Sequence, residues 1–460
     1  MVSLYAATLK IYPRSVHGIF AKWRWIMVFV TQLVFYGLPW LEWGQRQTVL
    51  FDLGARRFYV FGWVLYPQDF IYLTAILVIA AFSLFLFTAV AGRLWCGYAC
   101  PQTVYSEIFM WVEHKIEGDR SARMRLDDDA LSTEKLFKKS YKHIVWLCIA
   151  LWTGFSFVGY FTPIKELGMS FFLGNMSSWE VFWVFFYAFA TYGNAGFMRE
   201  QVCKYMCPYA RFQSAMFDKD TLIVTYDAER GEPRGPRSKK ADAVGLGLGA
   251  CVDCTLCVQV CPTGIDIRKG LQYECIGCGA CADVCDSVMD KVGYARGLVK
   301  YSTENAMNQH WTSKETLRHV FRPRVLLYTG ILAVVIAVLF TSLALRKPFK
   351  VDVVRDRAAL ARIVSGGKIE NVYRLQIMNA AETPLDFHLS ATGLPQLVLA
   401  TEASVRVAPT ESLWVSARLQ IPFDAAPPGA HPIEFLIQSV KPDGEVLSEL
   451  QEKSVFLVPR

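Results

Sequence analysis

Eight of the thirteen cysteines lie between residues 251 and 285, in two groups that share one spacing. Each group reads Cys-x2-Cys-x2-Cys-x3-Cys, and Pro262 follows the first group. A tight loop with two-residue spacers can supply three thiolates to one iron cube, so the fourth thiolate has to come from elsewhere. The second group, which lies close by in the sequence, can supply it.

This spacing is that of a bacterial two-cluster ferredoxin and predicts two neighbouring 4Fe-4S clusters. The predicted ligand sets are Cys251, Cys254, Cys257 and Cys285 for one cluster, and Cys275, Cys278, Cys281 and Cys261 for the other. A pair of zinc knuckles or a disulfide framework is the alternative, but zinc sites use two short pairs rather than a doubled run of four. Asp286 stands where a second proline would be expected. Because cluster assembly needs reduced thiols, we expect this segment on the cytoplasmic side.

The rest of the chain is too apolar for an ordinary soluble protein, with 53% hydrophobic residues and 13 tryptophans. Five uncharged runs of about 16 to 21 residues approach the length that crosses about 30 Å of hydrocarbon as a helix. These runs are Ile26 to Leu41, Ile71 to Val90, Ile144 to Phe161, Val181 to Met198 and Val325 to Leu345. We therefore predict a bundle of five transmembrane helices. The first run, with Pro39 near its end, has an interfacial helix as its alternative.

The placement of Lys and Arg predicts the orientation in the membrane, since cytoplasmic connections carry an excess of both. Basic residues precede the first run and recur in the segment 93–142, whereas the segment 162–180 holds only Lys165. We therefore expect a protein of the bacterial inner membrane. Its N-terminus and ferredoxin-like segment are expected on the cytoplasmic side, and the residues after Leu345 in the periplasm. The net charge of +7 is explained by this topology, and we predict no nucleic-acid partner.

Beyond residue 345, cysteine is absent and short alternating apolar stretches appear, such as Tyr373, Leu375 and Ile377. Several short strands in about 110 residues predict an immunoglobulin-like β-sandwich, with a barrel of other topology as the alternative. The predicted domains are an N-terminal membrane domain at 1–217, an inserted ferredoxin-like domain at 218–324, the fifth helix at 325–345 and a periplasmic β domain at 346–460. The fold class is therefore a multi-domain membrane protein.

Four of the remaining cysteines form a second repeat, Cys-x3-Cys-Pro, which occurs at Cys96 and Cys100 and again at Cys203 and Cys207. One copy follows the second apolar run and the other follows the fourth, so both are expected at the same membrane surface. A spacing of four residues places two sulfurs on one face of a helical turn. We predict a redox or metal site formed by the two pairs.

The chemistry of this second site stays open between a third iron–sulfur cluster, a dithiol that cycles through a disulfide, and a soft-metal site. A common small apolar residue of membrane helices is the ordinary alternative interpretation of a cysteine, and it is our interpretation of Cys148. Thiolate and thioether ligands favour Cu(I), and Met206 is a candidate extra ligand. Glu107 and Glu113, on the segment after the first pair, are interpreted as part of a solvated helix face.

Several motifs together resemble one family over nearly the whole chain: the CcoG proteins, also called FixG or RdxA, which are accessory factors for assembly of the cbb3-type cytochrome c oxidase. The matching segments are Phe51 to Leu53, Tyr66 to Phe70, Cys96 to Gln102, Glu117 to Arg120, Cys203 to Met216, Tyr226 to Asp227, Arg230 to Arg234 and Cys251 to Cys285. The β domain matches in type and position.

The resemblance implies a membrane cupric reductase that passes electrons through two 4Fe-4S clusters to Cu(II), with the four membrane thiols as its catalytic and copper-binding residues. The implied partners are membrane lipid, a cytoplasmic electron donor, copper ions, and copper-delivery or oxidase assembly factors. Two alternatives remain. One is an electron-transfer subunit that feeds a partner enzyme or quinone, as in the NapH and NosR-type membrane ferredoxins, which share the Cys-x3-Cys-Pro pairs. The other is a non-enzymatic assembly chaperone.

Overall fold

The computed structural model describes residues 10–44, 46–238, 245–356, 361–440 and 445–459. The chain forms two compact units. The first unit, called the cysteine unit below, is made of Met1–Leu50 and Ile71–Ala337 and holds all thirteen cysteines. The second, called the β unit, is made of Phe51–Phe70 and Val338–Arg460.

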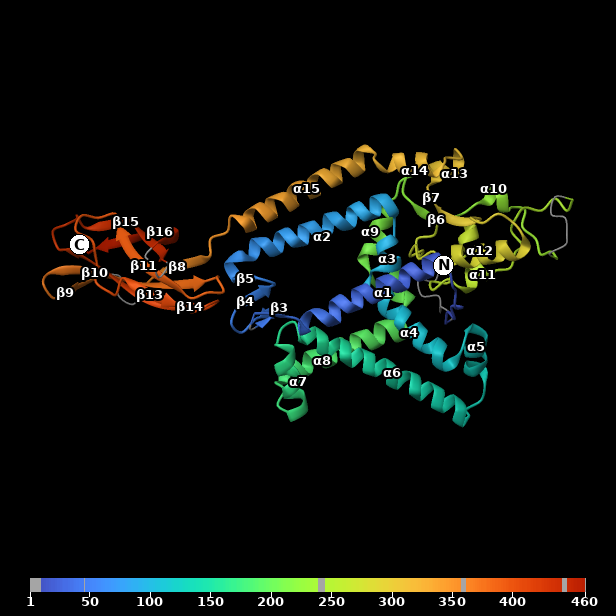
Figure 1. Cartoon of the computed structure of the whole chain (residues 1–460), viewed down its shortest axis with the longest axis horizontal. Helices are drawn as coiled ribbons and strands as arrows, with labels where there is room; N and C mark the ends of the chain where they lie inside the picture. Colours follow the sequence, from blue (N-terminus) through green and yellow to red (C-terminus); the bar gives the residue numbers. More distant parts are fainter. Residues whose placement is uncertain (1–9, 45, 239–244, 357–360, 441–444, 460) are drawn as a thin grey trace, which may run out of the picture. The chain divides into compact units, whose positions relative to one another are not determined.

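The cysteine unit is mainly helical (Figure 1). Its long helices are α1 (Ile19–Gly37), α2 (Phe70–Ala91), α4 (Pro101–Glu117), α6 (Thr133–Val158) and α15 (Pro323–Ala344). Shorter helical elements connect them: η1 (Leu38–Trp40), α3 (Leu94–Tyr98), α5 (Arg120–Asp128), α7 (Ile164–Leu173), α8 (Ser178–Thr191), η3 (Tyr192–Met198), η4 (Val202–Met206) and α9 (Pro208–Met216). A small strand pair, β1 (Glu42–Trp43) and β2 (Arg46–Gln47), follows η1.

Within the described residues, four helical stretches are long and apolar enough to cross a membrane: Ile19–Trp40, Pro67–Ala91, Thr133–Val158 and Pro323–Ala344. Each overlaps one of the five predicted runs. The remaining run, at 181–198, is divided between the 14-residue helix α8 and the 7-residue π-helix η3. A single helix needs about 20 residues to span the hydrocarbon core, so the predicted count of five remains a prediction.

Two of these helices begin well before the uncharged runs that predict them. Helix α1 starts at Ile19 and includes Arg24, while α6 starts at Thr133 and includes Lys142. Both cations are buried beside carboxylates of α4: Arg24 lies 3.0 Å from Glu107, and Lys142 lies 2.9 Å from Glu117. Because the partner neutralises the charge, each helix continues through a residue that interrupts the apolar pattern.

The ferredoxin-like segment is held together by the antiparallel pair β6 (Ile223–Tyr226) and β7 (Val299–Ser302). Between these strands lie α10 (Ala228–Gly231), α11 (Leu256–Gln259), η5 (Ile267–Lys269) and α12 (Ala280–Val292), and after them come α13 (Glu304–Asn308) and α14 (Ser313–Val320). The carboxylate of Asp283 in α12 accepts hydrogen bonds from the backbone N–H groups of Phe20 and Ala21, at 3.2 and 2.7 Å. The N-terminus of α1 is therefore fixed to the ferredoxin-like segment.

The β unit contains two antiparallel sheets (Figure 1). They enclose one apolar core. Its strands are β8 (Phe349–Arg355), β9 (Arg362–Val364), β10 (Lys368–Asn379), β11 (Leu385–Thr392), β12 (Val398–Leu399), β13 (Ser404–Val407), β14 (Ser412–Pro422), β15 (Gly429–Val440) and β16 (Val446–Val458). One sheet has the order β12-β14-β10-β8, with β9 paired to β10, and the other has the order β13-β11-β15-β16. Tyr373, Leu375 and Ile377 are fully buried, as their alternation predicts.

The connection before α2 also belongs to the β unit, which sequence reasoning did not predict. It forms a small sheet of β3 (Val49–Asp52), β4 (Arg57–Val60) and β5 (Trp63–Leu65), followed by η2 (Pro67–Asp69). The hydroxyl of Tyr66 donates to the carbonyl of Asn379 at 2.9 Å. The buried carboxylate of Asp69 pairs with Arg346 at 2.6 Å and also with Lys350. These contacts fix the connection onto the C-terminal domain.

Candidate iron–sulfur and thiol site

The two cysteine groups occupy equivalent places, each spanning a loop and the start of a helix. In the first group, Cys257 lies in α11, and in the second, Cys281 and Cys285 lie in α12. The structure shows all eight as free thiols. Cys251, Cys257 and Cys278 are buried, Cys254 is exposed, and the other four are half-buried. The sequence therefore folds into two loop-and-helix modules in which seven of the eight thiols are buried or half-buried.

The electrostatic surroundings of these thiols connect the two cysteine groups. Burial raises the pKa of Cys285 to about 12, with further contributions from Cys257, Cys254 and Cys251, its predicted co-ligands. Burial likewise raises the pKa of Cys281 well above its ordinary value, and the thiols that add to this rise are Cys278, Cys275 and Cys261, its predicted co-ligands, together with Cys257 of the other set. The two cysteine groups thus lie next to each other. The assignment of individual ligands remains a prediction.

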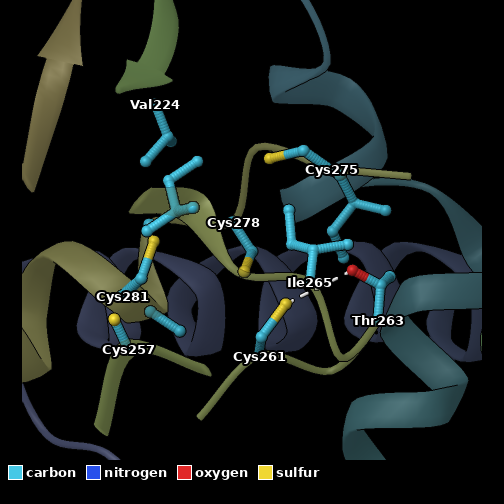
Figure 2. A pocket seen from close by; sticks show the side chains of 12 residues that line it. Val224, Cys257, Cys261, Thr263, Ile265, Cys275, Cys278 and Cys281 are labelled. Atoms are coloured by element: carbon cyan, nitrogen blue, oxygen red, sulfur yellow. Dashed lines mark hydrogen bonds between the residues drawn. The ribbon is translucent and has the colours of Figure 1, made fainter. Parts of the chain in front are cut away.

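The donor chemistry around these thiols fits an iron–sulfur cluster. Figure 2 shows Cys257, Cys261, Cys275, Cys278 and Cys281 around one cavity, whose other walls include aliphatic side chains such as Ile265. Within the described part of the chain, no three His, Cys, Asp or Glu side chains converge as they would around a single metal ion. Thiolates that surround a space with apolar walls suit a cube of iron and sulfide, which is larger than one ion.

The two Cys-x3-Cys-Pro motifs fold alike. Pro101 begins α4 and Pro208 begins α9, so each motif ends at the first residue of a helix, where proline costs no hydrogen bond. The N–H of Cys100 donates to the carbonyl of Trp95 at 3.0 Å. Likewise, the N–H of Cys207 donates to the carbonyl of Val202 at 2.8 Å. Each of these hydrogen bonds joins two residues that are five apart, which is the spacing of a π-helix. In both motifs, the acceptor is the residue before the first cysteine and the donor is the second cysteine. Such π-type turns are frequent at functional sites.

The structure brings all four of these thiols together from two distant parts of the chain. Burial raises the pKa of Cys96 to about 12, and the neighbours that raise it further are Cys100, Cys203 and Cys207. Burial also raises the pKa of Cys203 to about 11. Arg93 opposes both shifts, because its positive charge favours the thiolate. Cys148 is exposed in α6, apart from this group.

Helix α3, which carries Cys96, packs directly against the loop that carries Cys275 and Cys278. A Cβ atom at Gly97 would lie 2.9 Å from the carbonyl oxygens of Ile276 and Gly277 and 3.0 Å from the Cα atom of Cys278. Only glycine allows so close an approach. Cys96 and Cys203 also pack against the apolar cluster that contains Cys278. The thiol site and the second ferredoxin ligand set are therefore adjacent.

Two buried polar side chains near the thiols were not singled out from the sequence. Arg93 donates to the carbonyl of Ala210 and lies 3.4 Å from the carbonyl of Cys275. Gln213 accepts a hydrogen bond from the sulfur of Cys96 at 3.4 Å and donates to Thr88 at 3.2 Å. Arg93 directly follows an apolar run, and its place there was the available signal, whereas Gln213 lies in α9 after the second motif and carried no such signal.

Glu107 and Glu113 do not lie on a solvated helix face, contrary to the interpretation from sequence. Glu113 is buried and Glu107 is half-buried, and both are paired with cations. Glu113 lies 2.8 Å from Arg199, 3.0 Å from Arg123 and 3.5 Å from Lys142. Arg199 stands between the π-helix η3 and the second thiol motif, so Glu113 fixes that motif to α4. Burial alone would raise the pKa of Glu113, but the three cations together hold it below its ordinary value.

We expect Glu113→Gln to destabilise the protein by about 3–5 kcal/mol near neutral pH, because it leaves buried cations without their carboxylate. Since the folded pKa is lowered, the stabilisation is present above the ordinary pKa of glutamate and is lost as pH falls through the folded value. The difference between wild type and variant in apparent Tm should therefore shrink in acid. Glu134→Gln, at an exposed helix pair, is the matched control. An equal effect of both variants would contradict the role of Glu113.

Comparison with protein families supports the iron–sulfur chemistry. The model of a 4Fe-4S dicluster domain matches residues 198–304, and the model of a 4Fe-4S binding domain matches residues 72–118. A third model, the IG-like fold at the C-terminal of FixG, matches residues 339–459. The predictions of 4Fe-4S binding and of an immunoglobulin-like domain are thereby confirmed. The protein is an iron–sulfur protein of the electron-transfer class.

The relatives identify the family. The nitrogen fixation protein FixG of Rhizobium meliloti is 40% identical over 423 residues, which cover 85% of this chain and 81% of FixG. Protein RdxA of Cereibacter sphaeroides is 40% identical over 411 residues, covering 87% of this chain and 86% of RdxA. The ferredoxin-type protein NapH of Haemophilus influenzae is 22% identical over 46% of this chain and 66% of its own length. The chain belongs to the FixG/RdxA family.

Proposed function

We propose that this protein is a cupric reductase, which converts Cu(II) to Cu(I) for assembly of the copper centre of a cbb3-type cytochrome c oxidase. The proposal rests on one observation: four thiols lie close together, next to the Cys275–Cys278 loop. These thiols belong to Cys96, Cys100, Cys203 and Cys207. Soft thiolate ligands bind Cu(I) better than Cu(II), so copper held by these sulfurs is easier to reduce. The family resemblance supports copper as the acceptor.

When bound, two 4Fe-4S clusters supply one-electron storage. The chain's own residues then have three tasks. Cys96, Cys100, Cys203 and Cys207 hold the copper substrate, which gains one electron to become Cu(I). Arg93 favours the thiolate forms needed for metal binding. Gly97 keeps the copper ligands next to the cluster ligands.

The test is trapping of Cu(I) by a chromogenic chelator. The full chain, reduced anaerobically and freed of excess reductant, should reduce Cu(II) in proportion to its electron content. Each of the variants Cys96→Ser, Cys100→Ser, Cys203→Ser and Cys207→Ser should abolish the yield of Cu(I), because each removes a copper ligand. The iron–sulfur absorbance should stay intact. Cys148→Ser is the matched control and should behave as wild type. Wild-type yields from all four variants would remove the thiols from the mechanism.

A second candidate function is favoured by the family comparison. The 4Fe-4S binding model over residues 72–118 includes Cys96 and Cys100, and NapH is named a ferredoxin-type protein. The four thiols would then hold a third cluster, and the protein would pass electrons to a partner enzyme. Iron analysis distinguishes the two, because two clusters require about eight iron atoms per chain and three require about twelve.

The remaining parts of the proposal concern location and partners. We infer a cytoplasmic side for the ferredoxin-like segment, where a soluble reduced carrier supplies electrons, and a periplasmic side for the β unit. One point of this topology has structural support. The residues before α2 and those after α15 belong to the same β unit, so both segments are expected on the same side of the membrane. The β unit is then placed to contact copper-delivery or oxidase assembly factors. Protease protection of residues 346–460 in sealed inner-membrane vesicles would test the orientation.

A further inference from the structure

A large cleft lies where α1, α4 and α6 meet in the cysteine unit. Its volume is about 1270 Å3, which is ample for a cofactor-sized molecule. Val260 and Pro262, the two neighbours of Cys261, form part of its wall. The cleft therefore extends from a predicted ligand of the second cluster to the apolar faces of two candidate membrane spans.

The end of the cleft near Cys261 is polar. Arg24 and Glu107 line it, and the guanidinium donates to the carboxylate at 3.0 Å. Arg24 is 7% exposed, and its Nε atom has no hydrogen-bond partner among the described residues. A buried guanidinium beside a half-buried carboxylate gives this end of the cleft both hydrogen-bond donors and acceptors. Arg24 and Glu107 also lie near enough to Cys278 to act on its pKa, although burial is the larger cause of its rise.

The long walls of the cleft are aromatic and aliphatic. Phe29 of α1, Trp111 of α4, and Ile149 and Trp152 of α6 line them. Phe29, Trp111 and Trp152 are exposed large side chains. A ligand that fits this lining has a polar, oxygen-bearing ring at one end and a long hydrocarbon tail.

We propose that the cleft binds an isoprenoid quinone, with its ring beside Arg24 and Glu107 and its tail along the aromatic walls. A guanidinium N–H of Arg24 would donate to a quinone oxygen, and the carboxylate of Glu107 would accept from the hydroxyl of the quinol form. A redox-active lipid is favoured over a redox-silent one because the polar end is walled by the neighbours of a cluster ligand. This inference does not depend on copper as the electron acceptor.

An anionic phospholipid is the competing occupant of the cleft. Five Arg and Lys side chains line it, and three of these are paired with carboxylates: Arg14 with Asp119, Arg24 with Glu107, and Arg123 with Glu113. Lys22 and Lys115 are the other two. At the polar end, a phosphate would have to compete with Glu107 for Arg24, whereas the carbonyl oxygens of a quinone need only N–H or O–H donors.

Photoaffinity labelling of the full chain, with its clusters, in phosphatidylcholine nanodiscs tests the proposal. An azidoquinone with a short isoprenoid tail should label peptides of α1 and α4 that line the cleft. Excess unlabelled quinone should suppress the labelling, and excess phosphatidylglycerol should not. Labelling elsewhere, or equal suppression by phosphatidylglycerol, would overturn the inference.

A variant pair tests the same site independently. Ile108 lines the cleft, so Ile108→Trp fills part of it, whereas Leu33 is 75% exposed on α1 and does not line it. Ile108→Trp should lower cleft labelling at least about tenfold, equivalent to about 1.4 kcal/mol of binding free energy, and Leu33→Trp should not. Iron content reports whether each variant has assembled. Unchanged labelling in an assembled Ile108→Trp protein would refute the site. If that variant does not assemble, the positions of the labelled peptides in the wild-type protein decide whether the quinone occupies the cleft.

Discussion

Replacing Cys278 by serine should lower the iron content of the purified protein from about eight to about four atoms per chain. Cys278 is buried beside Cys275, Cys261 and Cys281, and serine does not replace a thiolate as an iron ligand. The cluster held by the other set should remain, because its four sulfurs are untouched. Anaerobic iron and sulfide analysis, together with the visible absorbance, measures the result.

Cys148→Ser is the control for this experiment, because Cys148 is exposed in α6 and belongs to neither ligand set. Its iron content should equal that of wild type. Unchanged iron in Cys278→Ser would overturn the ligand assignment. Zinc in place of iron in the wild-type protein would contradict the cluster interpretation altogether.

Gly97→Ala should separate the thiol site from the ferredoxin-like segment. The new methyl group would lie 2.9 Å from two backbone carbonyl oxygens, and backbone atoms cannot move aside as the end of a flexible side chain can. Overpacking of this kind costs about 1–3 kcal/mol, so the apparent Tm should fall. Cu(I) formation should slow as well, because α3 has to shift away from the Cys275–Cys278 loop.

The matched control is Gly37→Ala at the end of α1, where an added Cβ meets nothing within 4 Å. That variant should keep the wild-type Tm and Cu(I) yield. The iron content of Gly97→Ala should stay near the wild-type value, since all eight ferredoxin-like cysteines remain. Wild-type Cu(I) formation in Gly97→Ala would show that the close packing of α3 on the loop is not needed for electron delivery.

The parts of this molecule that can be predicted from sequence are those whose chemistry is local. The eight cysteines between residues 251 and 285 reveal iron–sulfur binding because the ligand spacing is a property of one short loop. Tyr373, Leu375 and Ile377 reveal a strand because alternate side chains face opposite sides of a sheet. The Cys-x3-Cys-Pro repeat likewise reveals a paired site, since each copy is complete within a few residues.

What the sequence does not reveal depends on contacts between distant segments. The starts of α1 and α6 were misplaced because Arg24 and Lys142 look like ends of an apolar run until their partners on α4 are known. Glu113 looks solvated for the same reason. Gly97 is an ordinary glycine in the sequence, and only the approach of the Cys275–Cys278 loop shows why no side chain fits there.

The carboxylate of Asp69, which pairs with Arg346 and Lys350, has a practical consequence for dissecting this protein. A soluble fragment that begins after α15 keeps both cations and loses their shared acidic partner, together with the hydroxyl of Tyr66 that caps the backbone at Asn379. A fragment whose boundary is the last helix therefore lacks contacts that the full chain supplies. An excised version that keeps them has to include residues 51–70, joined through a linker that replaces the chain from α2 to α15.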